Sequence, residues 1–518
     1  MISETALKQT LNGLDNYLVE MMNKNTLAGL AVGVVHEGEL VYCKGMGYAD
    51  IAQATPVTMD TGFRIASISK TFTAIGILQL LEQGKFNLDD SVNRYLKGFK
   101  VMHKDAFSPP VTFRHLLTHT SGIGEAPTIR EALPILLGKD PYFAKEGERV
   151  KPLAQMYGGL FITDVPAETK WAYANHAYAI LGQLVEDISG MPFPEYMIEH
   201  VFEPLGMYKT DYLFSERVRG QFAQGYLFKK GVFEPVTLKL RLLLGAGSIF
   251  SSVNEMVKYM EALMNGGANA HGRVLQAETL RMMMTPQLDT DTRVFSMGLG
   301  FWLHDFGGHQ IAGHGGSHPG FISDMKIAPE EKLGVVVFTN TNAMAPNFIG
   351  TEIMYRLLGV PNPDTDFPPR GIASRPYDWS RFCGFYGPKP GFLTNARLWL
   401  TFGGEVEVYV DRQNRLAVRT LFGPVSKGLP VYRADDEDPL LYRGQFKGGL
   451  MDGYPVSVLF KENHEGAVDR IHIHQNELYK RPYRRSLRFK AGIAIKIIGN
   501  LMGFVVLQLL LRKRKKRR

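Results

Sequence analysis

The chain has 518 residues, of which 45% are hydrophobic and 21% charged, so two or three globular domains with sizeable cores are expected. The formal net charge of +8 comes mainly from the seven basic residues at 512–518. The remainder carries no basic face suited to nucleic acid, and no nucleic-acid partner is expected. The two cysteines, Cys43 and Cys383, lie far apart in the chain and exclude a disulfide framework.

The first expected element is an amphipathic helix near the N-terminus, with Ser3 as its cap. Apolar residues recur there at steps of three and four, which keeps one face apolar. These residues are Leu7, Leu11, Leu14, Leu18 and Met21. Strands at 30–35 and 40–44 follow as a hairpin. No charged-then-apolar secretory signal precedes them.

Ser67 and Lys70 stand three residues apart, just before a nearly all-apolar run at 71–82. Side chains at i and i+3 share one face of a helix, so the hydroxyl and the amine are expected within hydrogen-bonding reach. A helix that is apolar all round is buried, and burial lowers the pKa of an amine. The pair therefore predicts an activated hydroxyl nucleophile at a helix N-terminus, where developing negative charge is stabilised.

A Ser-x-x-Lys spacing alone is weak evidence, because roughly one or two chance copies are expected in a chain this long. A second copy does occur, in Ser323-Asp324-Met325-Lys326. On the alternating, strand-like pattern of that segment, positions i and i+3 point to opposite faces. We therefore interpret the second copy as coincidence.

A mostly helical middle is predicted from Ile68 to about Leu263, and it contains the one Tyr-x-Asn of the chain, Tyr173-Ala174-Asn175. A phenol held near two cations loses its proton readily and can relay a proton to a leaving group. An Asn two residues on can orient Lys70 and hydrogen-bond a substrate amide. Taken alone, these residues favour a blander alternative, a loop Tyr packed on the core with a helix-capping Asn.

The third motif is Gly313-His314-Gly315-Gly316-Ser317, between strand-like segments at 310–312 and 320–322. Three glycines around one His let a ligand approach the backbone closely. The backbone N–H of Ser317 could then complete an oxyanion hole with that of Ser67. The alternative is a Gly-rich turn with a solvated His.

Strands are predicted at 298–303, 310–312, 321–327 and 333–339. With the N-terminal hairpin they predict a single antiparallel sheet that is closed by the two ends of a domain at 1–360. Helices are expected on both faces of this sheet, which makes the fold class α+β.

Residues 361–380 are rich in proline and predict a semi-rigid linker. Residues 381–485 carry short alternating runs separated by Gly, Asn and Asp turns, which predict a small antiparallel β barrel or sandwich.

Residues 490–518 are predicted to form a hydrophobic helix with a basic tail. The apolar run at 491–511 is long enough to span a bilayer, although Lys496 and Asn500 interrupt it. An interfacial helix on anionic lipid and a packed soluble helix are the alternatives. We expect membrane association through 491–518, with binding of membrane lipid. The sequence does not decide on which side of the membrane the protein lies.

In this order, the three motifs resemble the serine β-lactamase and penicillin-binding-protein family, most of all its class C β-lactamase, D-alanyl-D-alanine carboxypeptidase and esterase branch. The likeness covers roughly residues 5–355 and includes the segments 60–66, 115–122 and 245–252. It implies a β-lactamase/transpeptidase-like fold for the first domain. The β domain is similar to the lipocalin-like modules attached to some of these hydrolases.

The resemblance also implies roles for the motif residues. Ser67 is implied as the acylated nucleophile, with Lys70 and Tyr173 as base and proton relay. The backbone N–H groups of Ser67 and Ser317 are implied as the oxyanion hole. The substrate-binding positions are Asn175, His314, Gly315 and Gly316.

In one respect the chain departs from part of this family. The β-lactamases proper carry Lys-Thr-Gly where this chain has His314-Gly315-Gly316. A His is only partly charged near neutral pH and lacks the reach of a Lys, so recognition of a substrate carboxylate should be weaker. The expected activity is therefore hydrolysis of an ester or a peptide-like amide, in a small molecule or short peptide, rather than efficient penicillin hydrolysis.

Two other classes of function stay open at this point. One is a catalytically silent penicillin-binding-like receptor, and the other is a membrane scaffold in which the β domain and tail carry the function; oligomer formation is open as well. Acyl transfer needs no cofactor and none is expected. His115 and His119 have a helical zinc-ligand spacing, but no third ligand is evident nearby and no metal is expected.

Overall fold

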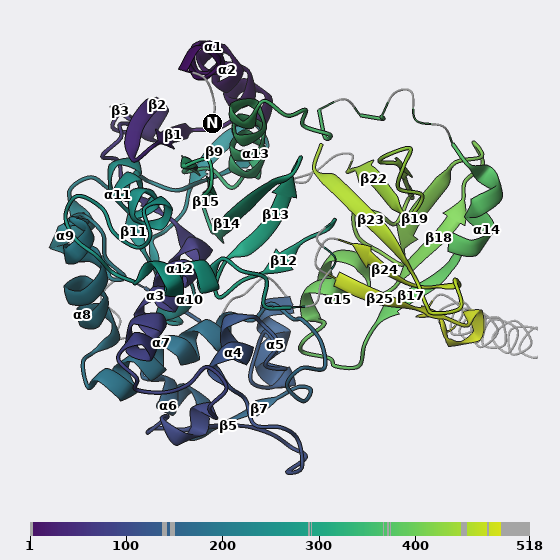
Figure 1. The fold of residues 1–518 in the computed structure, drawn as a ribbon, viewed down its shortest axis with the longest axis horizontal. Coiled ribbons are helices and arrows are strands. Elements are labelled where there is room, and N and C mark those ends of the chain that lie inside the picture. Colours follow the sequence, from purple (N-terminus) through teal and green to yellow (C-terminus); the bar gives the residue numbers. More distant parts are fainter. Residues whose placement is uncertain are drawn as a thin grey trace, which may run out of the picture. The chain divides into compact units, whose positions relative to one another are not determined.

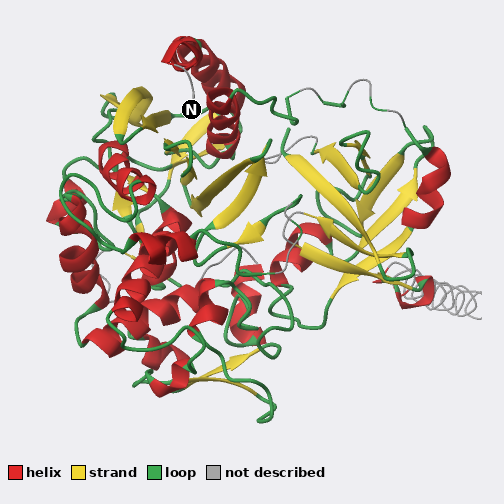
Figure 2. Cartoon of the chain, viewed as in Figure 1, coloured by secondary structure: helices red, strands yellow, loops and turns green. Residues whose placement is uncertain are grey.

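The computed structural model of the chain describes most residues between 4 and 490. The gaps are 137–141, 146–150, 289–290, 292, 366, 370–371, 373, 447–452, 474–475 and 488–489. The chain forms two compact units, Met1–Asp366 with Pro390–Ala396, and Phe367–Lys389 with Arg397–Arg518. Helices surround a sheet in the first unit, whereas strands dominate the second (Figures 1 and 2).

The first unit is built on an eight-stranded sheet with the strand order β12-β13-β14-β15-β16-β1-β2-β3. β1 pairs antiparallel with β16, from Leu30 opposite Thr339 to His36 opposite Leu333. The two ends of the domain therefore close one antiparallel sheet, as predicted. The strands are β1 Gly29–His36, β2 Glu39–Asp50, β3 Thr55–Pro56, β12 Ser296–Met297, β13 Trp302–Phe306, β14 His309–His318, β15 Phe321–Ala328 and β16 Leu333–Thr339.

Apolar cores cover both faces of this sheet, which explains why β1 and β16 are apolar at nearly every position. One core packs α1, α2 and α13 against the sheet, and the other contains α3, α7 and α11. These helices are α1 Glu4–Asn12, α2 Leu14–Asn25, α13 Ala345–Leu358, α3 Ser69–Glu82, α7 Asn175–Ser189 and α11 Val253–Met264. The single N-terminal helix expected from the sequence is thus two helices that meet at Gly13.

The segment between β3 and β12 is mostly helical, as predicted, with short strands between the helices. Its two-residue strand β4 and the turn η1 lead directly into α3. The shorter elements are β4 Phe63–Arg64, η1 Ala66–Ile68, η2 Val92–Arg94, β5 Lys100–His103, α4 Phe113–Leu117, α5 Ile129–Leu136, β6 Phe143–Lys145, α6 Leu153–Tyr157, β7 Leu160–Thr163, α8 Phe193–Met197, η3 Ile198–Phe202, η4 Glu203–Leu205, α9 Glu216–Arg219, β8 Tyr226–Lys229, β9 Val232–Pro235, β10 Lys239–Arg241, α10 Leu244–Gly247, β11 Phe250–Ser251 and α12 Ala277–Met283.

The second unit is a nine-stranded antiparallel sheet with the order β20-β19-β18-β17-β25-β24-β23-β22-β21. Its two edge strands, β20 and β21, are separated in the sequence by Val431 alone, so the sheet curls until its edges meet as a nearly closed barrel. The sequence predicted either a β barrel or a β sandwich, and the structure shows the barrel. The elements are η5 Pro376–Asp378, α14 Trp379–Phe382, β17 Gly384–Pro388, α15 Ala396–Phe402, β18 Val406–Val410, β19 Leu416–Thr420, β20 Leu429–Pro430, β21 Tyr432–Arg433, β22 Leu441–Gln445, β23 Pro455–Glu462, β24 Val468–Ile473, β25 Asn476–Arg481 and η7 Tyr483–Arg485.

The predicted C-terminal hydrophobic helix at 490–518 and the membrane association that depended on it are corrected. No helix in the part of the chain that the structure describes is long and apolar enough to cross a bilayer. Residues 491–518 themselves lie outside that part. Within their apolar run a central Lys such as Lys496 costs about 2.5–3.5 kcal/mol. Membrane localisation and lipid binding through this segment are withdrawn.

Candidate active site

Ser67 and Lys70 meet as the sequence predicted. The Lys70 ammonium nitrogen lies 3.1 Å from Ser67 Oγ, and Lys70 is fully buried. Ser67 itself lies in the turn η1, two residues before α3 begins. The residue before Ser67, Ala66, has a φ of 47°. This left-handed conformation is rare for a residue with a side chain and is typical of strained turns at functional sites.

Two further oxygen atoms surround the Lys70 amine. Lys70 Nζ donates to Asn175 Oδ1 at 2.9 Å and to the backbone oxygen of Ala246 at 2.6 Å. With Ser67 Oγ these make three acceptors, which match the three N–H groups of an ammonium. In the neutral amine, two N–H groups can keep the two carbonyl oxygens while the lone pair faces Ser67. The site thus accommodates both the ammonium and the neutral amine of Lys70.

The backbone carbonyl of Ala246 was not foreseen from the sequence, although its segment, 245–252, was singled out. Ala246 belongs to α10, which packs against α7 through two glycines. A Cβ on Gly245 would lie 2.5 Å from the backbone oxygen of Tyr178. The absence of a side chain at 245 therefore lets α10 approach α7 closely enough to place this carbonyl on Lys70.

Tyr173 lies beside Lys70, as predicted. The Lys70 nitrogen is 4.7 Å from the centre of the Tyr173 ring. The ring also packs 4.5 Å from the His119 ring and 6.3 Å from the His314 ring, between centroids. The three motifs that were found separately in the sequence therefore converge on one place.

His119 fixes the backbone on both sides of Tyr173. Its Nδ1 accepts the N–H of Ala174 at 3.2 Å, and its backbone oxygen accepts the N–H of Ala172 at 2.9 Å. His119 is fully buried and has a φ of 60°. Its role is therefore to position Tyr173, which the sequence did not reveal.

The neighbouring His115 also makes contacts within the protein. Its Nε2 is 2.9 Å from Glu168 Oε1, and its Nδ1 accepts the backbone N–H of Thr112 at 3.2 Å. Among the described residues, no group of three or more potential metal ligands lies together. The zinc spacing of His115 and His119 is thus taken up by hydrogen bonds that hold α4 and the Tyr173 loop.

His314 is buried on β14, with its ring stacked 4.8 Å from the ring of Trp302. Its Nδ1 lies 2.6 Å from the backbone oxygen of Gly315. Burial, and then the positive charge of Lys70, lower the pKa of His314 to about 3. His314 is therefore neutral at physiological pH, and a neutral ring that donates from Nδ1 leaves Nε2 as an acceptor. Within the part of the chain that the structure describes, Nε2 is buried without a hydrogen-bond partner.

The glycines after His314 belong to a strand, so the alternative of a Gly-rich turn does not hold. β14 continues through Ser317, and β13 pairs only with its first half, up to Gly313. No other described strand pairs with that edge of 314–318. Gly316 faces η1, where an added Cβ would lie 2.3 Å from the backbone oxygen of Ile65. The strand can therefore approach η1 only as glycine, and none of the described strands pairs with its edge there.

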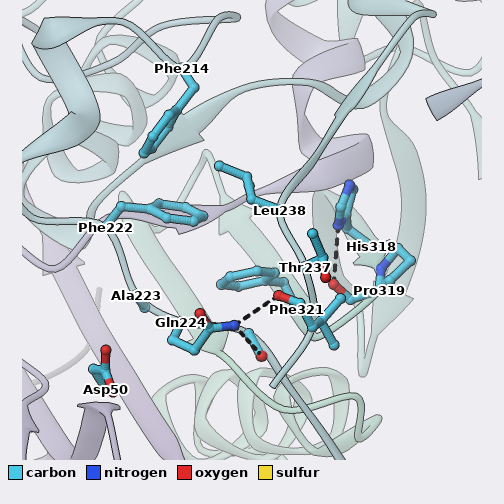
Figure 3. A pocket seen from close by; sticks show the side chains of 12 residues that line it. Asp50, Phe214, Phe222, Ala223, Gln224, Thr237, Leu238, His318, Pro319 and Phe321 are labelled. Atoms are coloured by element: carbon cyan, nitrogen blue, oxygen red, sulfur yellow. Dashed lines mark hydrogen bonds between the residues drawn. The ribbon is translucent and has the colours of Figure 1, made fainter. Parts of the chain in front are cut away.

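A cavity of about 230 Å³ lies at the far end of β14. None of the motif residues lines it, but His318, the residue after Ser317, does. Ala223, which also lines the cavity, is bonded to the segment that precedes Ser67. Its N–H donates to the backbone oxygen of Gly62 at 2.9 Å. Figure 3 shows apolar side chains gathered around it, among them Phe214, Phe222, Leu238 and Phe321.

The sheet closed by both ends of the first domain, with a Ser–Lys pair at the start of a buried helix, defines a β-lactamase/transpeptidase-like protein. A family model described as Beta-lactamase matches residues 14–356. The chain therefore belongs to the β-lactamase family, and the resemblance inferred from the motifs is confirmed. The relatives of the chain in this family are serine hydrolases.

Individual relatives are more distant. The chain is 28% identical to a D-aminopeptidase of Brucella anthropi over 340 residues, which cover 64% of this chain and 59% of that protein. It is 31% identical to the esterase EstB of Burkholderia gladioli over 268 residues, 50% of this chain and 66% of the esterase. A solved structure, the octameric penicillin-binding protein homologue from Pyrococcus abyssi, covers 90% of this chain and 99% of its own, with a TM-score of 0.61 and 24% identity. At this identity the structural likeness shows the fold alone.

Proposed function

We propose that this protein is a serine hydrolase that forms a covalent acyl-enzyme between Ser67 and an ester or a peptide-like amide. The observation that carries the proposal is the contact of Lys70 Nζ with Ser67 Oγ at 3.1 Å, beside the two fixed acceptors Asn175 Oδ1 and Ala246 O. A buried amine that can donate to two carbonyl oxygens and turn its lone pair to a hydroxyl is suited to remove the proton of that hydroxyl.

The reaction would proceed in two steps. Ser67 Oγ attacks the substrate carbonyl as its proton passes to Lys70, and the oxyanion accepts hydrogen bonds from the backbone N–H groups of Ser67 and Ser317. Such a donor contributes roughly 3–4 kcal/mol to stabilising the transition state. Tyr173, beside the Lys70 nitrogen, relays the proton to the leaving group. Water then hydrolyses the acyl-enzyme by the reverse proton path.

The environment of His314 supports substrates without an essential carboxylate. A neutral, buried imidazole with an open acceptor nitrogen suits a hydrogen-bond donor such as an amide N–H, whereas a carboxylate would meet an uncharged ring at this position. The cavity beyond His318, which apolar and polar side chains line together, supports an acyl group with an apolar portion on the same substrate. Relatives named as a D-aminopeptidase and an esterase are consistent with both bond types.

The test compares Ser67→Ala with Ser323→Ala, which removes the hydroxyl of the second Ser-x-x-Lys copy. Both variants and the wild type are treated with a fluorophosphonate probe and with p-nitrophenyl esters, after thermal unfolding has shown that they fold. Labelling and turnover should vanish in Ser67→Ala and persist in Ser323→Ala. Full labelling of Ser67→Ala would refute the proposal. If the wild type is active, its rates on a panel of esters, D-amino-acid peptides and β-lactams rank the substrates.

A further inference from the structure

A short segment from late in the sequence folds into the catalytic unit. Residues Pro390–Ala396, which we call the strap, belong to the first unit, although the residues before and after them form the second. Leu393 of the strap is buried in a small apolar cluster with Ala126 and Ala132. A Cβ on Gly124 would lie 2.3 Å from Leu393 Cβ, so the strap sits directly on the backbone of the 122–126 loop.

One carboxylate holds the strap in place. Asp164, the residue after β7, accepts the backbone N–H of Thr394 at 2.8 Å and its hydroxyl at 2.7 Å, and the N–H of Phe392 at 3.2 Å. Gly391 has a φ of 123°, and a Cβ there would collide with the Asp164 carboxylate at 2.7 Å. The strap therefore has one defined conformation rather than a loose surface contact.

The strap also contacts the segment that carries Tyr173. Lys170 Nζ donates to Asn395 Oδ1 at 2.5 Å, and Asn395 is only 7% exposed. Three residues later comes Tyr173, whose backbone neighbours on both sides are bonded to His119. The segment 170–175 is thus fixed at its start by the strap and beside Tyr173 by His119.

We propose that Asn395 is a positioning residue for Tyr173, acting through Lys170, so that the strap sets the efficiency of proton delivery to the leaving group. This inference rests on the proposed hydrolase function. General acid–base groups work only in close geometry, and a shift of about 1 Å can cost 10²-fold in rate. Tyr173 is the group whose placement depends on Lys170, whereas Ser67 and Lys70 are held by α3 and α7.

This role has a signature that a purely structural contact lacks. A p-nitrophenolate departs without a proton, but an alkoxide does not. Loosening of Tyr173 should therefore slow alkyl esters much more than p-nitrophenyl esters. We expect Asn395→Ala to lower kcat for a methyl or ethyl ester about 10-fold, against less than about 2-fold for the p-nitrophenyl ester of the same acid, with KM unchanged.

The experiment compares four variants over an ester series of graded leaving-group pKa. Lys170→Ala should give the same steepened dependence as Asn395→Ala, although Asn395→Ala also removes the hydrogen bond from Asn395 Nδ2 to the backbone oxygen of Gly391. The double variant should be no worse than Asn395→Ala, because both single variants remove the contact between Lys170 and Asn395. Asn395→Asp, which keeps the acceptor for Lys170, should restore most of the lost rate. Phe392→Ala is the matched control, since its side chain on the same strap is exposed, and it should leave the series unchanged.

The outcomes separate this inference from the hydrolase proposal. If the wild type neither turns over esters nor is labelled at Ser67, both fail. If the wild type is active but Asn395→Ala and Lys170→Ala slow all esters equally, or none, only the role of the strap is overturned. The same holds if Phe392→Ala steepens the series as much as Asn395→Ala. Thermal unfolding of each variant identifies a misfolded protein, and Lys170→Ala, at a half-buried position, serves if Asn395→Ala does not fold.

Discussion

Two adjacent glycines on β14 give a matched pair of substitutions that tests whether the strand supports the nucleophile turn. A Cβ on Gly316 would lie 2.2 Å from Ser323 Oγ and 2.3 Å from the backbone oxygen of Ile65. A Cβ on Gly315, on the opposite face, would be crowded by the side-chain amide of Asn347, at 2.9 Å, and its next neighbour would be the backbone oxygen of Ser323 at 3.7 Å. The same methyl group is thus added at neighbouring positions, toward the nucleophile turn in one case and away from it in the other.

The size of the effect follows from these distances. Non-bonded contacts are comfortable only near 3.5 Å, so Gly316→Ala must move the backbone at Ile65 by about 1 Å. Ile65 lies two residues before Ser67. A displacement of about 1 Å at a reacting group can cost 10²-fold, and overpacking of this kind destabilises by about 1–3 kcal/mol. For Gly315→Ala, a side-chain amide can move aside, and we expect less than about 1 kcal/mol and less than about 3-fold in rate.

The assay is the single-turnover acylation rate with a p-nitrophenyl ester, alongside urea unfolding. Adding Ser323→Gly to Gly316→Ala removes the contact with the hydroxyl but not the one with Ile65. That double variant should regain some stability and none of the acylation rate. If Gly316→Ala acylates within about 3-fold of the wild type, or if Gly315→Ala loses as much, the close approach of β14 to the nucleophile turn is not what maintains it.

Three further predictions concern His314 and the cavity. The pKa of His314 is about 3 rather than the usual 6.5, so the unfolded chain binds more protons between these values and stability should fall as pH drops from 6.5 toward 3, by at most about 1.4 kcal/mol per pH unit. Urea unfolding at pH 7 and 4.5 should show this fall in the wild type and a smaller one in His314→Gln. His314→Lys should raise acylation by a penicillin about 10-fold, because a charged hydrogen bond to the substrate carboxylate becomes available; no gain would contradict the absence of a carboxylate clamp. Leu238→Trp, which fills the cavity, should lower kcat/KM for an octanoyl ester about 10-fold relative to the acetyl ester, and an equal loss for both would show that the acyl group binds elsewhere.

The sequence was most informative where the chemistry is local. Ser67 and Lys70 are three residues apart, and the i, i+3 geometry alone predicts the contact that the structure contains. The closed antiparallel sheet was predictable for a similar reason, since alternation and apolar runs mark each strand. The second Ser-x-x-Lys copy lies on a strand, where positions i and i+3 point to opposite faces, and its Ser and Lys have separate partners. Ser323 Oγ is bonded to the backbone oxygen of Ile65, and Lys326 forms its ion pair with Asp324.

Features that depend on distant segments were not predictable. The carbonyl of Ala246 reaches Lys70 across 176 residues of chain, and Asn395 reaches Lys170 across 225. Neither contact has a local pattern, because a backbone oxygen looks the same in every sequence and a lone Asn in a loop has many roles. The sequence predicted that the glycines around His314 let a ligand approach the backbone, but it did not reveal that β14 lies too close to η1 for a side chain at position 316.

The ligands of Lys70 explain why local and distant features matter together. Its three acceptors come from positions 3, 105 and 176 residues away in the chain, on η1, α7 and α10. Loss of either carbonyl partner would leave a buried amine short of an acceptor, which is costly in an apolar interior, and the amine would then shift its hydrogen bonds toward Ser67. Lys70 cannot accept the proton of the Ser67 hydroxyl while it donates its own N–H to that hydroxyl. In the proposed mechanism, packing of α10 on α7 through Gly245 is therefore a condition for basicity at Lys70, and not only for stability.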